Sequence, residues 1–199
     1  MFFKRRTTAI DWIIAGLGNP GKKYEHTRHN VGFDALDLAA ERWNIPVKRS
    51  KFDALSGDGA VDGRRVLLLK PQTFMNLSGK SLVKATEYYK VPAERVIVLC
   101  DDVNLKPGVL RIRASGSDGG HNGLKSLITF LGEDFPRVRI GVGDKPHPDY
   151  DMADWVTGKP SAADKKLIES RYGDIEGALR LLMAGQPDEA MARYNGAPK

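Results

Sequence analysis

The chain has 199 residues, of which 41% are hydrophobic and 28% are charged. This length predicts a single domain, and the composition excludes a fibrous, disordered or membrane-spanning protein. No stretch approaches the roughly 20 consecutive apolar residues that a membrane helix requires. The apolar pair at the start precedes its positive charges, the reverse of a secretory signal, so we expect a cytoplasmic protein whose residues 1–8 form a flexible extension.

The charge of the chain is unevenly distributed. Lys and Arg number 31 against 25 Asp and Glu, a net charge of +6, and residues 160–199 contribute none of it because they hold six acids and six bases. Residues 104–114 include Lys106, Arg111 and Arg113 and no acid. Taken alone, such a segment is first explained as a solvated edge strand, although the basic charge also suggests a polyanionic partner.

Apolar periodicity and turn residues predict alternating strands and helices. In chain order, we expect a strand over 11–16, a helix over 31–43, a hairpin over 51–61 and 64–70, a helix over 75–89, strands over 95–100 and 109–113, a helix over 122–131, a strand over 138–142, and a helix from Ser161 to about 183. With no repeat and no long linker, the pattern predicts one α/β domain over residues 1–199. Its central sheet should be mixed, mostly parallel, and flanked by helices.

The segment Gly16 to Gly21 (GLGNPG) matches the glycine pattern of dinucleotide-binding proteins. That pattern requires a helix to begin at the loop, so that its first N–H groups meet a pyrophosphate. Here Pro20-Gly21 predict a turn, and residues 22–29 intervene before helical spacing begins. We therefore predict that the loop binds no dinucleotide and that the protein uses no cofactor.

Polar residues gather instead in four connections of the predicted sheet. In an α/β fold such connections meet at a sheet edge, where ligands bind. They carry Asn19, Tyr24, His29 and Asn30 after the first strand, Asn76 at a helix start, Asp101 after the most apolar strand, and His121 and Asn122 after a glycine-rich stretch. Each has an ordinary structural explanation when taken alone; Asn76, for example, would serve as a helix N-cap.

Taken together, these residues favour hydrolysis by activated water. A histidine oriented by a carboxylate is a general base, and uncharged amides suit peptide groups and a developing oxyanion. The GxSxG pattern of a nucleophilic serine is absent, and Cys100 lies within an apolar strand, where we expect it to be inert. The histidines lack the HExxH context of a metal site, and one cysteine excludes a disulfide and a multi-cysteine zinc site, so we expect no metal.

Five stretches together resemble the bacterial peptidyl-tRNA hydrolase family, in the family's order. They are Gly16 to Asp34 (GLGNPGKKYEHTRHNVGFD), Lys70 to Gly79 (KPQTFMNLSG), Asp101 to Gly108 (DDVNLKPG), Gly119 to Lys125 (GGHNGLK) and Arg139 to Gly143 (RIGVG). The resemblance implies a monomeric, metal-free hydrolase that recycles tRNA in translation. It would cleave the ester between a peptide and the ribose at the tRNA 3′ end.

The resemblance also assigns roles to individual positions. The family's catalytic histidine falls on His29 within TRHN, and its partner aspartate falls on Asp101. The substrate-binding asparagines fall on Asn19, Asn76 and Asn122, of which Asn19 or Asn122 would stabilise the oxyanion. The remaining matches are Phe74 and Met75 in the peptide cleft, Tyr24 near the tRNA 3′ end, His121 beside the third asparagine, and Arg111 and Arg113 facing phosphates of the acceptor arm.

Two other functions stay open at this stage. A chloroplast relative of the family acts in RNA splicing by binding a partner protein, which would predict an exposed apolar patch. A general esterase would cleave small esters with no dependence on tRNA or salt. Hydrolysis of N-acetylated aminoacyl-tRNA, but not of the unblocked form, would separate all three functions.

Overall fold

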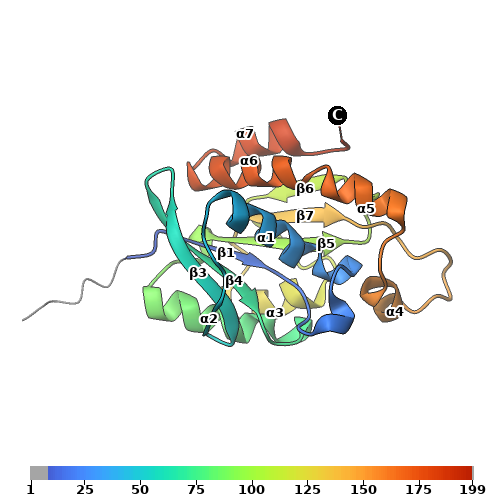
Figure 1. Cartoon of the computed structure of the whole chain (residues 1–199), viewed down its shortest axis with the longest axis horizontal. Helices are drawn as coiled ribbons and strands as arrows, with labels where there is room; N and C mark the ends of the chain where they lie inside the picture. Colours follow the sequence, from blue (N-terminus) through green and yellow to red (C-terminus); the bar gives the residue numbers. More distant parts are fainter. Residues whose placement is uncertain (1–8, 199) are drawn as a thin grey trace, which may run out of the picture.

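The computed structural model describes residues 9–198, so the expected extension over residues 1–8 lies outside the described part. Seven strands form one mixed sheet in the order β2-β3-β4-β1-β5-β7-β6 (Figure 1). Their bounds are β1 Trp12–Gly16, β2 Arg49–Lys51, β3 Ala54–Val61, β4 Arg64–Pro71, β5 Val96–Asp102, β6 Leu110–Arg113 and β7 Arg137–Gly141. The four central strands β4, β1, β5 and β7 are parallel, and antiparallel pairing adds β3 and β2 at one edge and β6 at the other. The predicted α/β class and mixed sheet are therefore confirmed.

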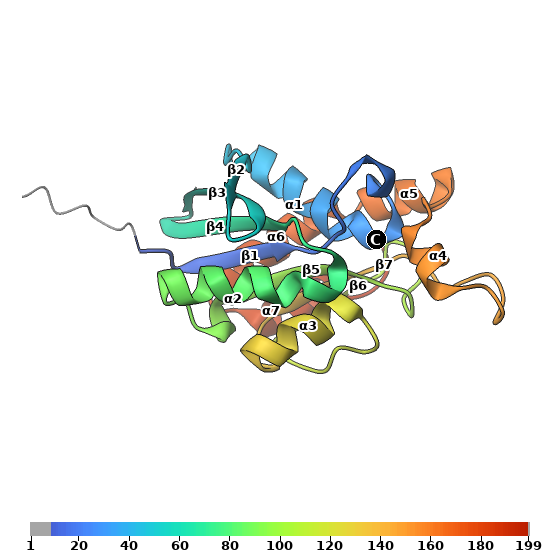
Figure 2. The same cartoon turned by 90° about the horizontal axis from the view of Figure 1, so that it is seen from below.

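Helices cover both faces of this sheet (Figure 2). Helices α1 (Val31–Arg42), α6 (Tyr172–Met183) and α7 (Pro187–Tyr194) share a buried core with one face, and α2 (Ser78–Tyr89) and α3 (Asn122–Leu131) share a second core with the other. The alternation of side chains along the strands builds both cores, since Ile13 and Val98 face one and Ile14 and Ile97 face the other. Within residues 9–198, no helix is long and apolar enough to cross a membrane.

Glycine allows α1 to sit directly on the end of the sheet. A Cβ on Gly32 would lie 2.4 Å from the carbonyl oxygen of Leu99 and 2.6 Å from that of Leu17. No real side chain accepts such contacts, so only glycine permits this approach. Because Gly32 is the second residue of α1, this packing also fixes the turn that precedes the helix, η2 (Arg28–Asn30).

The predicted helix from Ser161 to about residue 183 is wrong as a single helix. Ser161 does cap its start, since the Ser161 hydroxyl oxygen accepts a hydrogen bond from the Asp164 N–H. However, the chain breaks at Ser170 and Arg171 into α5 (Ala162–Glu169) and α6. The physical reason is the buried Arg171 guanidinium, which donates to the carbonyl oxygens of residues 108, 194 and 196 and so holds the chain at the break.

Two other boundaries differ from the sequence prediction and bear on the site. The expected helix over 75–89 begins as a 3-10 turn, η3 (Met75–Leu77), so Asn76 lies in that turn and its side chain does not cap α2. Strand β5 continues two residues beyond its predicted end and includes Asp101 and Asp102. Pairing of Asp101 with Ile140 of β7 holds that aspartate rigidly in the sheet. Two short helices, α4 (Met152–Thr157) and α7, were not predicted.

Candidate active site

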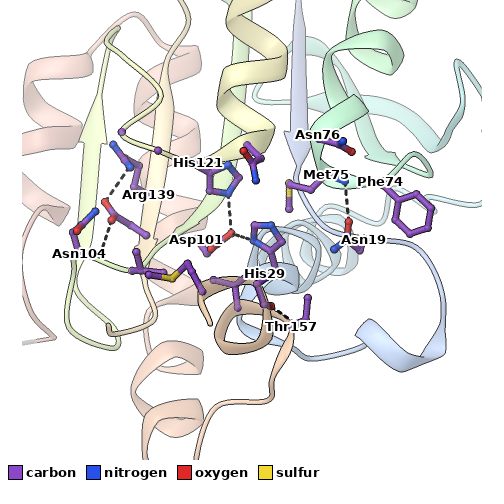
Figure 3. Close-up of a pocket in the computed structure, with 18 residues that line it drawn as sticks. Asn19, His29, Phe74, Met75, Asn76, Asp101, Asn104, His121, Arg139 and Thr157 are labelled. Carbon is purple, nitrogen blue, oxygen red and sulfur yellow. Dashed lines mark hydrogen bonds and ion pairs between the residues drawn. The ribbon is translucent and has the colours of Figure 1, made fainter. Parts of the chain in front are cut away.

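The four polar connections do meet at one edge of the sheet. They surround a cleft of about 580 Å³ beyond the carboxyl ends of β1 and β5 (Figure 3). Its walls come from the loop after β1, from η2, from η3, from the end of β5, from the start of α3 and from α4. Of the site residues predicted from the sequence, those that line this cleft are Asn19, His29, Phe74, Met75, Asn76, Asp101, His121 and Asn122.

A single carboxylate oxygen organises the centre of the cleft. Oδ1 of Asp101 lies 2.8 Å from Nδ1 of His29 and 2.9 Å from Nε2 of His121 (Figure 3). The side chain of Asp101 is 2% exposed, against 12% for His29, so the carboxylate is sealed in while the His29 ring reaches the cleft. The two imidazole rings lie 5.2 Å apart between centroids.

Hydrogen bonding fixes the proton positions on both rings. His121 immediately precedes α3, and its Nδ1 accepts from the N–H groups of Gly123 and Leu124 at 3.1 and 3.2 Å. Because Nδ1 accepts, the proton of the neutral ring must be on Nε2, from which it donates to Asp101. His29 likewise donates from Nδ1 to the carboxylate. Its Nε2 is therefore the nitrogen with a free lone pair.

The electrostatics of the pair follow from burial and charge. Burial alone would raise the pKa of Asp101, but the two histidines hold that pKa well below its usual range. Burial would lower the pKa of His29, yet the Asp101 charge and its hydrogen bond outweigh burial, so the pKa of His29 lies above its ordinary value. Asp101 thus remains ionised beside a histidine whose basicity it increases.

Asn19 is held by its neighbours so that its amide nitrogen is left for the cleft. Its Oδ1 accepts from the Met75 N–H at 2.8 Å, which orients the amide. Its own backbone is held by the buried side chain of Asn30, whose Oδ1 accepts from the Asn19 N–H at 2.8 Å and whose Nδ2 donates to the Asn19 carbonyl at 3.0 Å. Asn30 is therefore a positioning residue for Asn19. Asn30 was expected among the polar residues of this loop, but its local sequence assigned it no role.

The other two asparagines stand at the mouth of the cleft. Asn76 in η3 and Asn122 at the first position of α3 are both exposed, and both line the cleft beside Phe74, which is 56% exposed. Met75 is buried beneath them. Tyr24, in contrast, belongs to η1 (Lys22–Tyr24) and is not among the residues that line the cleft.

Arginines gather on one face of β6 and β7, next to the cleft. The register places Arg111 opposite Arg139 and Arg113 opposite Arg137. Directly opposed like charges destabilise a sheet unless they are neutralised. Nε of Arg139 lies 3.0 Å from the Asp102 carboxylate as an ion pair, and Arg137 is buried against backbone carbonyl oxygens, including that of Glu133 at 2.9 Å. Arg111 and Arg113 are exposed on this edge strand.

Two elements of the site were not identified from the sequence. Arg139 lines the cleft, although it was expected only as part of a stretch that matches the family. Helix α4 supplies four lining residues, Met152, Ala153, Val156 and Thr157. The signal for α4 was the Asp151 N-cap with Asp154 three residues later, because the Asp151 carboxylate accepts from the Asp154 N–H.

Nucleophilic and metal chemistry fit this arrangement poorly. Cys100 is fully buried in β5, and burial raises the pKa of its thiol far above the usual range, so it is not a nucleophile. His29, Asp101 and His121 offer ligand-type atoms within 4.8 Å of one another. However, Nε2 of His121 carries the proton that it donates to Asp101, so it has no lone pair for a metal ion.

An α/β domain whose cleft holds a carboxylate-oriented histidine and fixed amides is typical of a hydrolase. Comparison with known proteins gives the family. Residues 13–199 match the model of the peptidyl-tRNA hydrolase family. The chain therefore belongs to this family, whose members hydrolyse the ester bond of peptidyl-tRNA.

Individual relatives agree with the family match. The chain is 50% identical over 186 residues to the peptidyl-tRNA hydrolase of Agathobacter rectalis, which covers 92% of this chain and 100% of the relative. It is 51% identical to that of Caldanaerobacter subterraneus, over 93% of this chain and 100% of the relative. The crystal structure of peptidyl-tRNA hydrolase from Acinetobacter baumannii superposes with a TM-score of 0.89 at 35% identity, covering 94% of this chain and 95% of the other.

The Asn30 contacts predict the effect of an isosteric change. Asn30→Asp replaces the donating amide with an oxygen that faces the Asn19 carbonyl in a buried site. We expect the free energy of unfolding to fall by about 2 kcal/mol or more, because the buried Asn19 carbonyl loses its donor and residue 30 becomes a buried charge. Urea denaturation measures this. Asn104→Asp, the same change at an exposed residue of the cleft, should alter stability by less than about 0.5 kcal/mol; equal losses in the two variants would contradict the role of Asn30.

Proposed function

We propose that this cleft hydrolyses peptidyl-tRNA with His29 as the general base for water. The observation that carries the assignment is the shared contact of Asp101 with His29 and His121, at 2.8 and 2.9 Å. With its proton on Nδ1, His29 presents the Nε2 lone pair to the cleft. Water bound there would lose a proton to Nε2 as its oxygen attacks the ester carbonyl.

Asn19 is suited to stabilise the negative charge that forms on the carbonyl oxygen. Oxyanion donors work best when they are fixed before the reaction. The Asn19 amide meets that condition, because Met75 holds its oxygen and Asn30 holds its backbone. Of the two residues that the sequence analysis left open, Asn19 is thus favoured over the exposed Asn122. The imidazolium of His29, stabilised by Asp101, would return its proton to the departing ribose oxygen.

Asn76, Asn122 and Phe74 are proposed to bind the peptide. The two exposed amides can pair with the N–H and C=O groups of a peptide, while the half-exposed ring of Phe74 packs on its side chains. A free α-ammonium has no such amide to offer, so unblocked aminoacyl-tRNA would bind poorly. Tyr24 keeps its predicted role near the tRNA 3′ end, outside the cleft itself.

The arginine face of β6 and β7 is proposed to hold the acceptor arm. The exposed side chains of Arg111 and Arg113 project from β6 next to the cleft, and the carboxylate of Asp102 there is already engaged by Arg139. Phosphates would relieve the repulsion between these opposed arginines.

We also infer that the protein acts as a monomer, and in the cytoplasm, where translation produces its substrate.

The experiment that tests the function compares two substrates. N-acetylated aminoacyl-tRNA should be hydrolysed at least 10-fold faster than the unblocked form, since only the blocked form carries an amide for the asparagines. His29→Ala should lower kcat by about 100-fold or more, in the range expected when a general base is lost. Release of radiolabelled amino acid at saturating substrate measures both.

The exposed His147 provides the matched control, because it does not line the cleft. His147→Ala should retain wild-type turnover. Near-normal turnover of His29→Ala would show that another group is the base. Failure of the wild-type protein to cleave the blocked substrate would reject the hydrolase function and favour a binding role, whereas cleavage of small esters without tRNA would indicate a general esterase.

Salt dependence tests the arginine face separately. If Arg111 and Arg113 contact phosphates, log(kcat/KM) should fall with log[salt], and the Arg111→Gln/Arg113→Gln variant should reduce that slope by about 1 to 2, because each lost phosphate contact removes somewhat less than one unit. The variant should also lower kcat/KM at low salt and leave kcat unchanged.

Lys48→Gln/Arg49→Gln removes the same two charges from exposed positions beside and on β2, at the opposite edge of the sheet. This control should keep the wild-type slope. Identical slopes for the two variants would mean that only net charge matters, and that β6 makes no specific contact with tRNA.

A further inference from the structure

One wall of the cleft is a short helix with little buried surface of its own. Helix α4 has six residues, and only Val156 among them is buried. A helix this short is not stable by itself, so its position depends on contacts with the rest of the protein. Yet Met152, Ala153, Val156 and Thr157 all line the cleft; Figure 3 labels Thr157 on this wall. The contacts that hold α4 therefore determine the shape of the cleft on this side.

The buried guanidinium of Arg28 supplies most of those contacts. Its Nη1 donates to the carbonyl oxygens of Lys159 at 3.0 Å and Trp155 at 3.3 Å, at the end of α4 where carbonyl groups lack helical partners. Its central carbon lies 3.4 Å from the centroid of the Trp155 ring, a close cation–π stack. The backbone N–H of Arg28 donates to the Gly158 carbonyl at 3.0 Å.

Trp155, the aromatic partner in this stack, is also bound to the segment that follows β7. Its indole Nε1 donates to the carbonyl oxygen of Gly143, just after β7, at 2.8 Å. Arg28 and Trp155 thus form one clamp between η2, α4 and the end of β7. Because Arg28 and His29 are consecutive residues of η2, the clamp joins α4 to the segment that carries the proposed base.

We propose that Arg28 is a positioning residue that holds α4 against the His29 turn, and that this placement determines how tightly the cleft binds peptidyl-tRNA. The inference rests on the proposed function. The face that α4 offers is mainly apolar, and the one hydroxyl on it, that of Thr157, already donates to the Ala153 carbonyl at 2.7 Å. The wall therefore contributes apolar contact with the substrate, with no polar group for the chemical step, so it acts on binding.

The test combines kinetics with hydrogen exchange in the full-length protein. Arg28→Lys keeps the positive charge but loses the planar stack and shortens the side chain whose Nη1 donates to both carbonyl oxygens, and Trp155→Leu loses the stack and the bond to Gly143. In each variant we expect KM for N-acetylated aminoacyl-tRNA to rise by about 10-fold. The value of kcat should stay within about twofold of wild type, and the pH profile of kcat should be unchanged. Amide exchange in residues 152–158 should become about 10-fold faster, while the rest of the protein exchanges as before.

The double variant supplies an internal check. Since both substitutions break the same clamp, its KM should rise no further than about that of the more affected single variant. Arg180→Lys is the matched control, because Arg180 also stacks on a tryptophan, Trp43, at 5.8 Å and bonds to acidic groups, but lies outside the cleft. It should leave KM and the exchange of α4 unchanged.

Three results would overturn the proposal. Unchanged exchange in residues 152–158 of Arg28→Lys would show that Arg28 does not hold α4. Faster exchange with an unchanged KM would show that this wall does not bind substrate. A fall in kcat with a shifted pH profile would mean that Arg28 acts through His29 instead. Failure of the proposed function itself would appear differently, as loss of hydrolysis by the wild-type protein, and the exchange measurement would still test the clamp.

Discussion

The site depends on one carboxylate oxygen that two imidazoles share. Asp101 is fixed in a central strand and almost completely buried, where an unpaired charge would be very costly. It remains ionised because His29 and His121 both donate to it. The two histidines differ in what their second ring nitrogen does. His121 already accepts two backbone N–H groups of α3, so it is fixed as a neutral donor, whereas His29 keeps a free nitrogen toward the cleft.

The arrangement connects the start of α3 to the proposed catalytic centre. His121 is at once the N-cap of α3 and a hydrogen-bond partner of Asp101, so Asn122, the next residue, has a defined position relative to His29. Asn19 is placed by comparable means, through Met75 on one side and Asn30 on the other. The side chains that would meet the substrate are thus few, and buried polar neighbours orient several of them. This is the support that a preorganised site requires.

Much of the fold and of the candidate site could be predicted from the sequence. The features that could not be predicted depend on residues that are distant in the chain. Apart from the short β2, the strands followed from local patterns, as did the helix over 122–131 and the convergence of Asn19, Asp101 and Asn122 at one sheet edge. The break before Tyr172 did not, because the carbonyl groups that attract Arg171 come from residues 108, 194 and 196. The capping role of His121 was equally hidden, since histidine is not a usual N-cap. Helix α4 is held by Arg28, 127 residues away from Trp155 in the chain.

The pH dependence of kcat/KM in wild type and Asp101→Asn tests the central claim most directly. A general base works when neutral, so activity is lost as the pH falls through the pKa of His29. In wild type, where Asp101 raises that pKa, the inflection should lie above about 6.5, the ordinary value for histidine. Asparagine removes the charge but leaves the burial, so the inflection should move below that value while the maximal rate falls. An inflection that stays in place, or moves upward, would contradict the account.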